Sequence, residues 1–193
     1  MRKIIVQEFL TLDGVMQAPG GETEDTEGGF AHGGWQRQYG DQVFGEVITK
    51  TFASADILLL GRKTYDIFAA YWPTATEDLE IAKTLNEWPK YVASHTKDVL
   101  TWQNSHLLQG NIIEEVAKLK KLPGKNILVI GSGDFAQTLM QGNLIDEYQL
   151  MIHPLVLGSG KHLFREGGPK QALAFLSSQV TTTGVVILNY ARR

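Results

Sequence analysis

The chain has 193 residues, of which 43% are hydrophobic, with a formal net charge of -3 and a sequence pI near 5.9. This length and apolar content predict one compact domain over residues 1–193, and the small negative charge gives no general attraction to nucleic acid or membranes. The absence of cysteine excludes disulfides, thiolate metal sites and a cysteine nucleophile. Its opening apolar run is too short for a signal peptide and no stretch could span a bilayer, so we expect a cytoplasmic protein.

Short runs rich in Ile, Val, Leu and aromatic residues recur along the chain and predict buried strands. They cover residues 3–10, 56–60, 91–94, 126–130, 147–152 and 185–190. Between them, apolar residues at helical spacing predict helices over 41–52, 112–122 and 137–141. This alternation predicts an α/β sandwich with a largely parallel sheet.

The C-terminal tail has a different pattern. An apolar segment over 172–177 is followed by a turn at 181–184 and by the strand over 185–190. Two strands joined by a short Thr- and Gly-containing turn predict an antiparallel hairpin added to the sheet.

Residues 19–34 form the least apolar segment of the chain, with many glycines, several acidic residues and Phe30 as the main apolar side chain. Such a composition predicts a mobile surface loop that contributes nothing to the core. Two interpretations stay open, a connection without a functional role and a lid over an active site.

A glycine turn follows the strand predicted over 126–130. Gly131, Ser132 and Gly133 separate this strand from a helix, so the backbone can approach a ligand closely. Free amides at the start of a helix attract phosphate, and the turn therefore predicts a dinucleotide site.

The same turn satisfies the G-x-G-x-x-A form of the Rossmann fingerprint, but its context does not. The turn comes late in the chain, and the acidic residues Asp146 and Glu147 precede the following strand, whereas a Rossmann domain carries its acidic residue after that strand. A Rossmann-type dehydrogenase is therefore the weaker interpretation, and a tight turn without a ligand stays open.

Two further strand ends carry groups that suit phosphate. Gly61 ends the strand over 56–60 and is followed by Arg62, Lys63 and Thr64 at the start of a helix. Cations there oppose the helix dipole, so an anionic ligand would explain them better than stability does, although solvated surface charges are the alternative. The strand over 91–94 is followed by hydroxyl, imidazole and ammonium groups, which belong to Ser94, His95, Thr96 and Lys97. In a parallel sheet these ends share one edge.

Several motifs together carry a resemblance to a known family. They are Phe9-Leu10-Thr11-Leu12-Asp13-Gly14, Gly61-Arg62-Lys63-Thr64-Tyr65, Ile130-Gly131-Ser132-Gly133, and the stretches LIDEYQL at 144–150 and HPLVLGSGKHLF at 153–164. With them the chain resembles the dihydrofolate reductase-like superfamily, and more closely the reductase domain of bifunctional riboflavin-biosynthesis deaminase-reductases and its free-standing relatives.

The resemblance implies a dihydrofolate reductase-like three-layer sandwich, with a mixed, mostly parallel sheet, helices on both faces and a C-terminal antiparallel hairpin. It implies an NADPH-dependent reductase acting on a small pterin-like, aminouracil or ribosyl-imine substrate. A nucleotide-binding or regulatory module without turnover is the alternative. The resemblance also implies a homodimer, for which the apolar stretch over 148–157 is a candidate interface.

The resemblance further implies roles for individual residues. The cofactor site would consist of Gly61, Arg62, Lys63, Thr64, Ser94, His95, Thr96, Gly131, Ser132, Gly133, Asp134 and Phe135. Among these, the resemblance places Arg62 and Lys63 against the 2′-phosphate and pyrophosphate. Bidentate Arg geometry suits a phosphate monoester and so favours NADPH over NADH. Leu12, Asp13 and Gly14 would lie beside the nicotinamide and the substrate.

A few side chains have two interpretations each. Asp41 is a candidate proton donor or a helix cap, and Trp72 either walls the substrate pocket or packs at a helix end before Pro73. His153 is expected in the core, and His162 either contacts a substrate phosphate or is solvated. We expect no metal, because no cluster of His and carboxylate residues has a suitable spacing.

Overall fold

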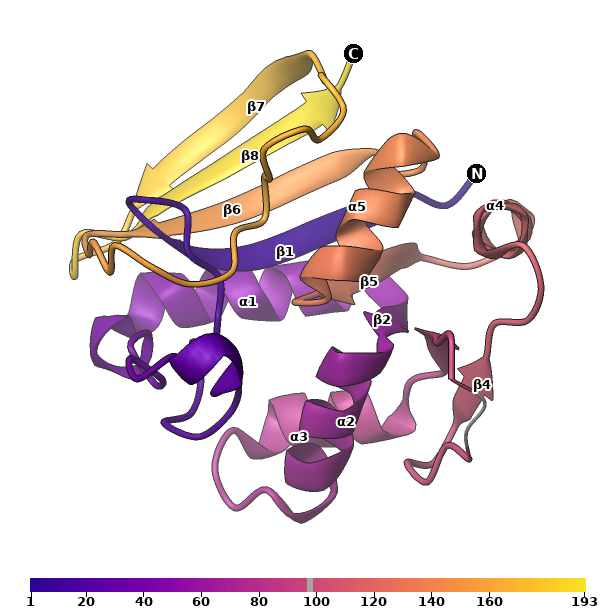
Figure 1. The fold of residues 1–193 in the computed structure, drawn as a ribbon, viewed down its shortest axis with the longest axis horizontal. Helices are drawn as coiled ribbons and strands as arrows, with labels where there is room; N and C mark the ends of the chain where they lie inside the picture. Colours follow the sequence, from indigo (N-terminus) through magenta and orange to yellow (C-terminus); the bar gives the residue numbers. More distant parts are fainter. Residues whose placement is uncertain (97–98) are drawn as a thin grey trace.

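The structure is a computed structural model that describes residues 1–96 and 99–193, so Lys97 of the third predicted strand end lies outside the described residues. Over these residues the chain forms one sheet of eight strands (Figure 1). The strands are β1 (Ile4–Thr11), β2 (Ala55–Gly61), β3 (Lys90–Ala93), β4 (Ser105–Leu107), β5 (Asn126–Ile130), β6 (Glu147–His153), β7 (Leu173–Val180) and β8 (Val186–Arg192). The α-helices are α1 (Gln42–Ala53), α2 (Arg62–Tyr71), α3 (Leu79–Glu87), α4 (Ile112–Lys121) and α5 (Gly133–Gln141).

The sheet is mixed and mostly parallel, as the sequence predicts. Its order is β4-β3-β2-β5-β1-β6-β8-β7, and all pairs among β1 to β6 are parallel. The C-terminal hairpin of β7 and β8 joins the sheet antiparallel through β6. Figure 1 shows this hairpin at the edge opposite β4.

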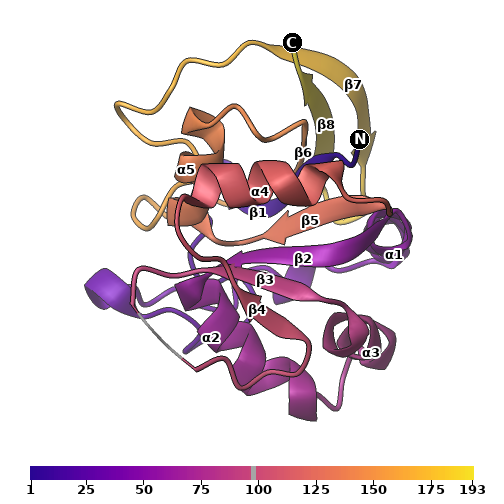
Figure 2. The ribbon, with the colours of Figure 1, turned by 90° about the vertical axis from the view of Figure 1, so that its right-hand side faces the viewer.

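Helices cover both faces of the sheet and give three layers (Figures 1 and 2). On one face Phe44 and Ile48 of α1 and Leu85 of α3 enter a buried cluster. On the other face Val116 of α4 and Leu139 of α5 enter a second one. These stripes arise because apolar residues three or four apart share a helix face. No helix within the described residues has both the length and the apolar character needed to cross a membrane.

The element boundaries agree with the sequence predictions to within a few residues, with three differences. Helix α5 begins at Gly133, four positions before the predicted start at Gln137, because Ser132 adopts a left-handed conformation that ends the turn early. Helix α3 and strand β4 were not predicted. Three-residue β4 is too short to give a periodic signal.

The prediction that residues 19–34 add nothing to the core is wrong. Phe30 is 8% exposed and packs with Val15, Ala18 and Trp35 in a small cluster of its own. The indole of Trp35 also donates a hydrogen bond of 2.8 Å to the Gln17 carbonyl. Two aromatic rings near the carboxyl-terminal end of this glycine-rich segment therefore fasten it to the domain.

Candidate active site at the carboxyl edge of the sheet

The carboxyl ends of β3, β2, β5 and β1 lie side by side, because these strands are parallel neighbours in that order. The turns after Gly61, Ala93, Ile130 and Thr11 therefore meet at one edge. Ligands bind at this edge in open α/β sheets, where helix N-termini point outward. The three predicted phosphate-binding turns are thus brought together.

The two glycine turns are joined by hydrogen bonds between side chains and backbone. The Gly61 amide donates to Ser132 Oγ at 3.0 Å, and the Ser132 amide donates to Thr64 Oγ1 at 2.8 Å. A Cβ on Gly131, which has a φ of +60°, would lie 3.1 Å from Thr64 Oγ1, so a side chain would strain this contact. The starts of α2 and α5 consequently form one unit.

This linkage uses polar groups of two residues predicted for the cofactor site. The Ser132 amide already donates to Thr64. Thr64 Oγ1 accepts from Ser132 and keeps its own proton for a ligand. The first-turn amides of α5 at Gly133, Asp134 and Phe135 are donors at this edge, because they have no carbonyl a turn earlier to bind.

The cations at the start of α2 are held by carboxylates of the protein. Arg62 Nε lies 2.9 Å from both carboxylate oxygens of Asp66, and its guanidinium lies 5.8 Å from the centre of the Tyr65 ring. Lys63 forms ion pairs with Asp25, at 2.8 Å, and with Glu27. Both side chains are positioned at the edge without any ligand.

Lys63 belongs to a four-charge cluster that fastens the loop over 19–34 to this edge. Lys161, in the loop after β6, lies 2.8 Å from Asp25 and 2.5 Å from Glu27, which also pair with Lys63. The side chains of Lys161 and Lys63 lower the pKa of Glu27 to about 2. The loop therefore stands beside the site, held by charge as well as by its aromatic residues.

A hollow of about 610 Å³ opens next to the first turn of α5. It is lined by Glu27, Asp134, Gly160, Lys161, His162, Phe164, Arg165 and Glu166. Arg165 pairs with Asp134 at 2.5 Å, so this hollow too contains paired cations. His162 lies here, at the hollow's lining, as the phosphate-contact interpretation requires.

The hydrogen-bond donors and positive charges of this edge suit a dinucleotide, provided that two side chains move away from the start of α5. A Cβ on Gly133 would lie 2.9 Å from Met16 Sδ and 3.4 Å from Arg165 Nη2, so these two side chains cover the start of α5. Both are long and flexible, and each can move aside at modest cost. The glycine is needed because any larger residue would occupy the space that a ligand approaches.

The loop after β1 is built around Asp13. Its carboxylate accepts hydrogen bonds from Thr11 Oγ1 at 2.5 Å and from the Gly158 amide at 2.7 Å, and these contacts lower the Asp13 pKa. Asp13 is therefore an organising residue of two loops. Its neighbour Leu12 is 68% exposed at the edge, and Gly14 turns the chain with a φ of +83°.

The turn after β3 lies next to the start of α2, as predicted. Ser94 Oγ donates to the Thr96 carbonyl at 2.8 Å, which closes a tight turn. His95 and Thr96 are exposed there. A ligand that extends from the glycine turns toward β3 would meet these exposed residues.

Trp72 and Asp41 are not arranged as site residues. Trp72 follows α2, a helix of 10 residues that leads about 15 Å away from the edge, and packs against Phe68 and Tyr71. Asp41 caps α1 by accepting from the Phe44 amide at 2.7 Å and also accepts from Thr182. These hydrogen bonds, with Thr182 foremost, lower the Asp41 pKa, which does not suit a proton donor.

His153 is a core residue, in agreement with the sequence prediction. It is fully buried among the rings of Phe9, Trp35, Tyr39 and Phe44, with centroid distances of 5.0 to 6.1 Å. Its Nδ1 lies 2.9 Å from the Met151 carbonyl, which identifies this nitrogen as the protonated one. Burial lowers the His153 pKa and keeps the ring neutral.

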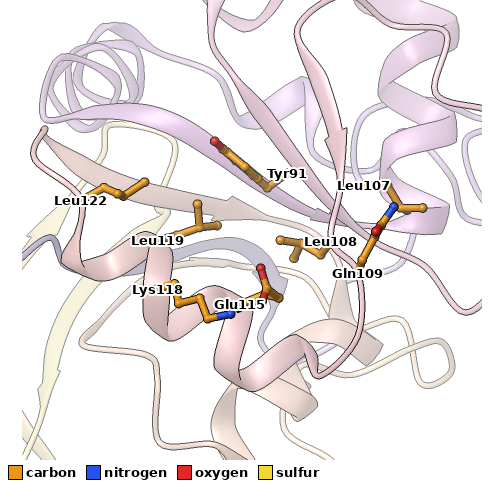
Figure 3. A pocket seen from close by; sticks show the side chains of 8 residues that line it. All are labelled: Tyr91, Leu107, Leu108, Gln109, Glu115, Lys118, Leu119 and Leu122. Atoms are coloured by element: carbon orange, nitrogen blue, oxygen red, sulfur yellow. Dashed lines mark hydrogen bonds and ion pairs between the residues drawn. The ribbon is translucent and has the colours of Figure 1, made fainter.

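A second hollow of about 270 Å³ lies between α4 and the strands β3 and β4 (Figure 3). Its lining is largely apolar, with Tyr91, Leu108 and Leu119 facing it. The only cation in its lining among the described residues, Lys118, pairs with Glu115 at 2.6 Å.

Three residues of this edge escaped the sequence predictions. Asp25 and Glu27 lie in a segment whose acidity alone indicates only a solvated loop, and their partners are distant in sequence. Glu8 is different, because a carboxylate inside the apolar run over 3–10 is a visible departure from the strand pattern. Such a departure indicates a site or a strained core position.

Residues 2–187 match the RibD C-terminal domain family. The chain is 32% identical over 192 residues to the uncharacterized protein YyaP of Bacillus subtilis, covering 98% of this chain and 94% of that protein. It is 26% identical over 170 residues to the uncharacterized protein YwjB of the same organism, covering 86% and 84%.

Two solved structures share the fold. A protein of Shewanella sp. PV-4 assigned to riboflavin biosynthesis superposes with a TM-score of 0.74 at 23% identity, covering 99% of each chain. A pyrimidine reductase-like protein of Corynebacterium diphtheriae superposes with a TM-score of 0.63 at 12% identity, covering 100% of this chain and 92% of the other. The expected dihydrofolate reductase-like sandwich is thereby confirmed. Since the family match spans the whole sheet edge with its glycine turns, the chain belongs to the RibD C-terminal domain family.

Proposed function

We propose that the protein is an NADPH-dependent reductase that transfers hydride to a small pterin-like, aminouracil or ribosyl-imine substrate. The observation that carries this proposal is the joined pair of helix starts at Gly61 and Gly133, with Arg62 and Lys63 beside them. Two helix N-termini and adjacent cations at one edge favour a ligand with several phosphates.

In this proposal the chain binds and orients, whereas NADPH supplies the hydride when it is bound. The first-turn amides of α5 would hold the pyrophosphate, and Arg62 would hold the 2′-phosphate with two parallel hydrogen bonds. Exposed Leu12 would exclude water from one side of the reacting rings. Because Asp66 already orients Arg62, little side-chain ordering is left for binding.

Replacing Arg62 with alanine is expected to weaken NADPH binding roughly 10- to 100-fold and to leave NADH binding nearly unchanged. The reason is that only NADPH carries the phosphate that the guanidinium would contact. Titration of the intrinsic fluorescence of the four tryptophans measures both affinities. Lys50→Ala, on the exposed surface of α1, is the control. Equal losses for both cofactors would refute the 2′-phosphate assignment.

Turnover is tested by NADPH oxidation in the presence of pterin, dihydrofolate and aminouracil compounds. Oxidation that depends on one of these compounds supports the reductase. Saturable NADPH binding without oxidation by any of them supports the alternative of a nucleotide-binding module on the same fold. Absence of saturable binding contradicts both.

We further propose that the protein forms a homodimer, but through β7. Of the stretch over 148–157 predicted as the interface, the part up to His153 lies in β6, inside the sheet between β1 and β8. Edge strand β7 instead exposes Phe175, Leu176 and Val180 by 51 to 62%. A second copy would cover these side chains and the open strand edge. Leu176→Lys is expected to convert a dimer to a monomer in light scattering, and an unchanged dimer mass would contradict this interface.

A further inference from the structure

Glu8 is a buried acid in the middle of the central strand β1. It is 4% exposed and lies between Val6 and Leu10, which are 0% and 3% exposed. Successive side chains of a strand point to opposite faces, so Glu8 shares its face with Val6 and Leu10, whose cluster packs against α5. Its position opposite Leu150 of β6 adds another apolar neighbour.

The carboxyl group of Glu8 has no compensating interaction in the described part of the chain. Its Oε1 is buried without a hydrogen-bond partner. Burial raises the Glu8 pKa well above the ordinary value, which favours the neutral carboxylic acid over the carboxylate. The elements packed over this face carry these titratable and charged groups: Glu114, Glu115, Lys118, Lys120 and Lys121 of α4, Asp134 of α5, Tyr148 on this face of β6, and Lys161, His162, Arg165 and Glu166 of the following loop.

Glu8 stands at the level of the candidate site. Gln7 pairs with Ile130, the last residue of β5, so Glu8 lies where β5 ends and the turn at Gly131 begins. On the same face, Met16 covers Gly133 at the start of α5. Movement of this flexible side chain would uncover the start of α5 on the face that Glu8 shares, beside the edge where the dinucleotide is proposed to bind.

Stability does not account for an acid at this position. An unpaired polar group in an apolar environment costs free energy that leucine or methionine would not. A neutral carboxylic acid, however, presents an O–H donor beside a C=O acceptor. This pair matches a carbonyl next to an N–H, which is the edge of an amide or of a lactam.

We propose that Glu8 is a binding residue of the reductase site, which in its protonated form pairs with an amide or lactam edge of the bound ligand. The inference rests on the proposed function and deepens it. Two ligands carry the required edge, the carboxamide of the nicotinamide ring and the lactam of a pterin or aminouracil substrate. The test therefore measures them separately.

The experiment uses the full chain with glutamate labelled with ¹³C at its side-chain carboxyl, and the variants Glu8→Gln and Glu8→Leu. Binding of oxidised NADP, of its 3-acetylpyridine analogue, which lacks the amide N–H, and of an aminouracil is measured between mildly acidic and alkaline pH. The same three titrations are repeated with Glu147→Gln, which makes the identical change at the amino end of β6. Circular dichroism verifies that each variant is folded.

We expect wild-type affinity to fall as pH rises through the Glu8 titration seen by ¹³C NMR. Glu8→Gln keeps a donor and an acceptor, so its affinity should stay near the wild-type value and lose the pH dependence. Glu8→Leu should bind about tenfold more weakly, corresponding to one buried hydrogen bond. A loss confined to NADP, and absent for the acetylpyridine analogue, identifies the carboxamide; a loss confined to the aminouracil identifies the lactam.

Two results together would overturn the inference and leave the proposed function intact. Glu8→Leu would bind both ligands at wild-type strength, and in the wild-type protein the ¹³C signal of the Glu8 carboxyl would not move when either ligand saturates the site. Failure of the wild-type protein to bind either ligand would instead refute the proposed function together with the inference that depends on it. The two failures are thus distinguished by the wild-type titration alone.

Discussion

Replacement of Lys90 by methionine is expected to lower the free energy of unfolding by about 3 kcal/mol. Lys90 of β3 is fully buried, and its Nζ donates to the carbonyls of Leu85, Asn86 and Trp88 at 2.5, 3.2 and 2.8 Å. These carbonyls end α3, where no helical amide is left to bind them. Methionine keeps much of the aliphatic volume but removes the donor from all three carbonyls, of which, among the described residues, only that of Asn86 also accepts from other side chains, those of Gln103 and Asn104.

Two opposing contributions also affect the expected loss of unfolding free energy, the desolvation of the Lys90 ammonium and its contact with an aromatic ring. Burial lowers the Lys90 pKa to about 8, so removing the charge recovers some desolvation free energy. The ammonium also lies 4.2 Å from the centre of the Trp102 ring, a contact that methionine retains only in part.

Chemical denaturation measures the difference for Lys90→Met. Lys83→Met on the exposed face of α3 is the matched control and is expected to change stability by less than about 0.5 kcal/mol. Equal stability of Lys90→Met and the wild-type protein would show that the carbonyls find other donors.

Replacement of Glu8 by glutamine is expected to stabilise the protein, and increasingly so as pH rises above 4.5. The unfolded chain ionises Glu8 near its ordinary pKa of 4.5, whereas burial raises the pKa in the folded protein. The folded state then binds more protons, so wild-type stability is lost as pH rises. The loss is about 1.4 kcal/mol for each pH unit over which only the folded state keeps the proton.

The pH dependence of stability has opposite signs for Glu8 and His153. Burial lowers the His153 pKa from 6.5, so its contribution is lost as pH falls below that value. Both Glu8→Gln and the wild-type protein contain His153, and the difference between their denaturation curves isolates Glu8. Below pH 4.5 the two proteins should have nearly equal stability, apart from the amide's own contacts. A constant difference over the whole pH range would contradict a buried neutral acid.

Much of the sheet could be predicted from the sequence because its parallel strands are apolar on both faces. The run over 126–130 coincides with β5, and those over 3–10 and 147–152 differ from β1 and β6 by one residue at their ends. The three turns also fall at one edge as expected, since parallel strands align their carboxyl ends. These features depend on local periodicity and on one topological rule.

The contacts that shape the site were not predictable, because they join residues that are distant in sequence. Ser132 and Thr64 looked like ligand contacts, yet each uses a polar group to bind the other turn. Asp41 had two interpretations, and only the position of the 181–184 turn shows that Thr182 occupies its second oxygen. Asp25 pairs with Lys161, which is 136 residues away in the sequence, and no local pattern indicates this pairing.

The bonds between the glycine turns also constrain the order in which the chain can assemble. They connect positions 71 and 68 residues apart, and the intervening chain includes α3, β3, β4 and α4. During synthesis, the cationic turn at Arg62 would leave the ribosome long before Ser132 exists to complete it. A multi-phosphate ligand would therefore have no finished site on a partly made chain, and by mass action it would favour only molecules in which β5 has been inserted.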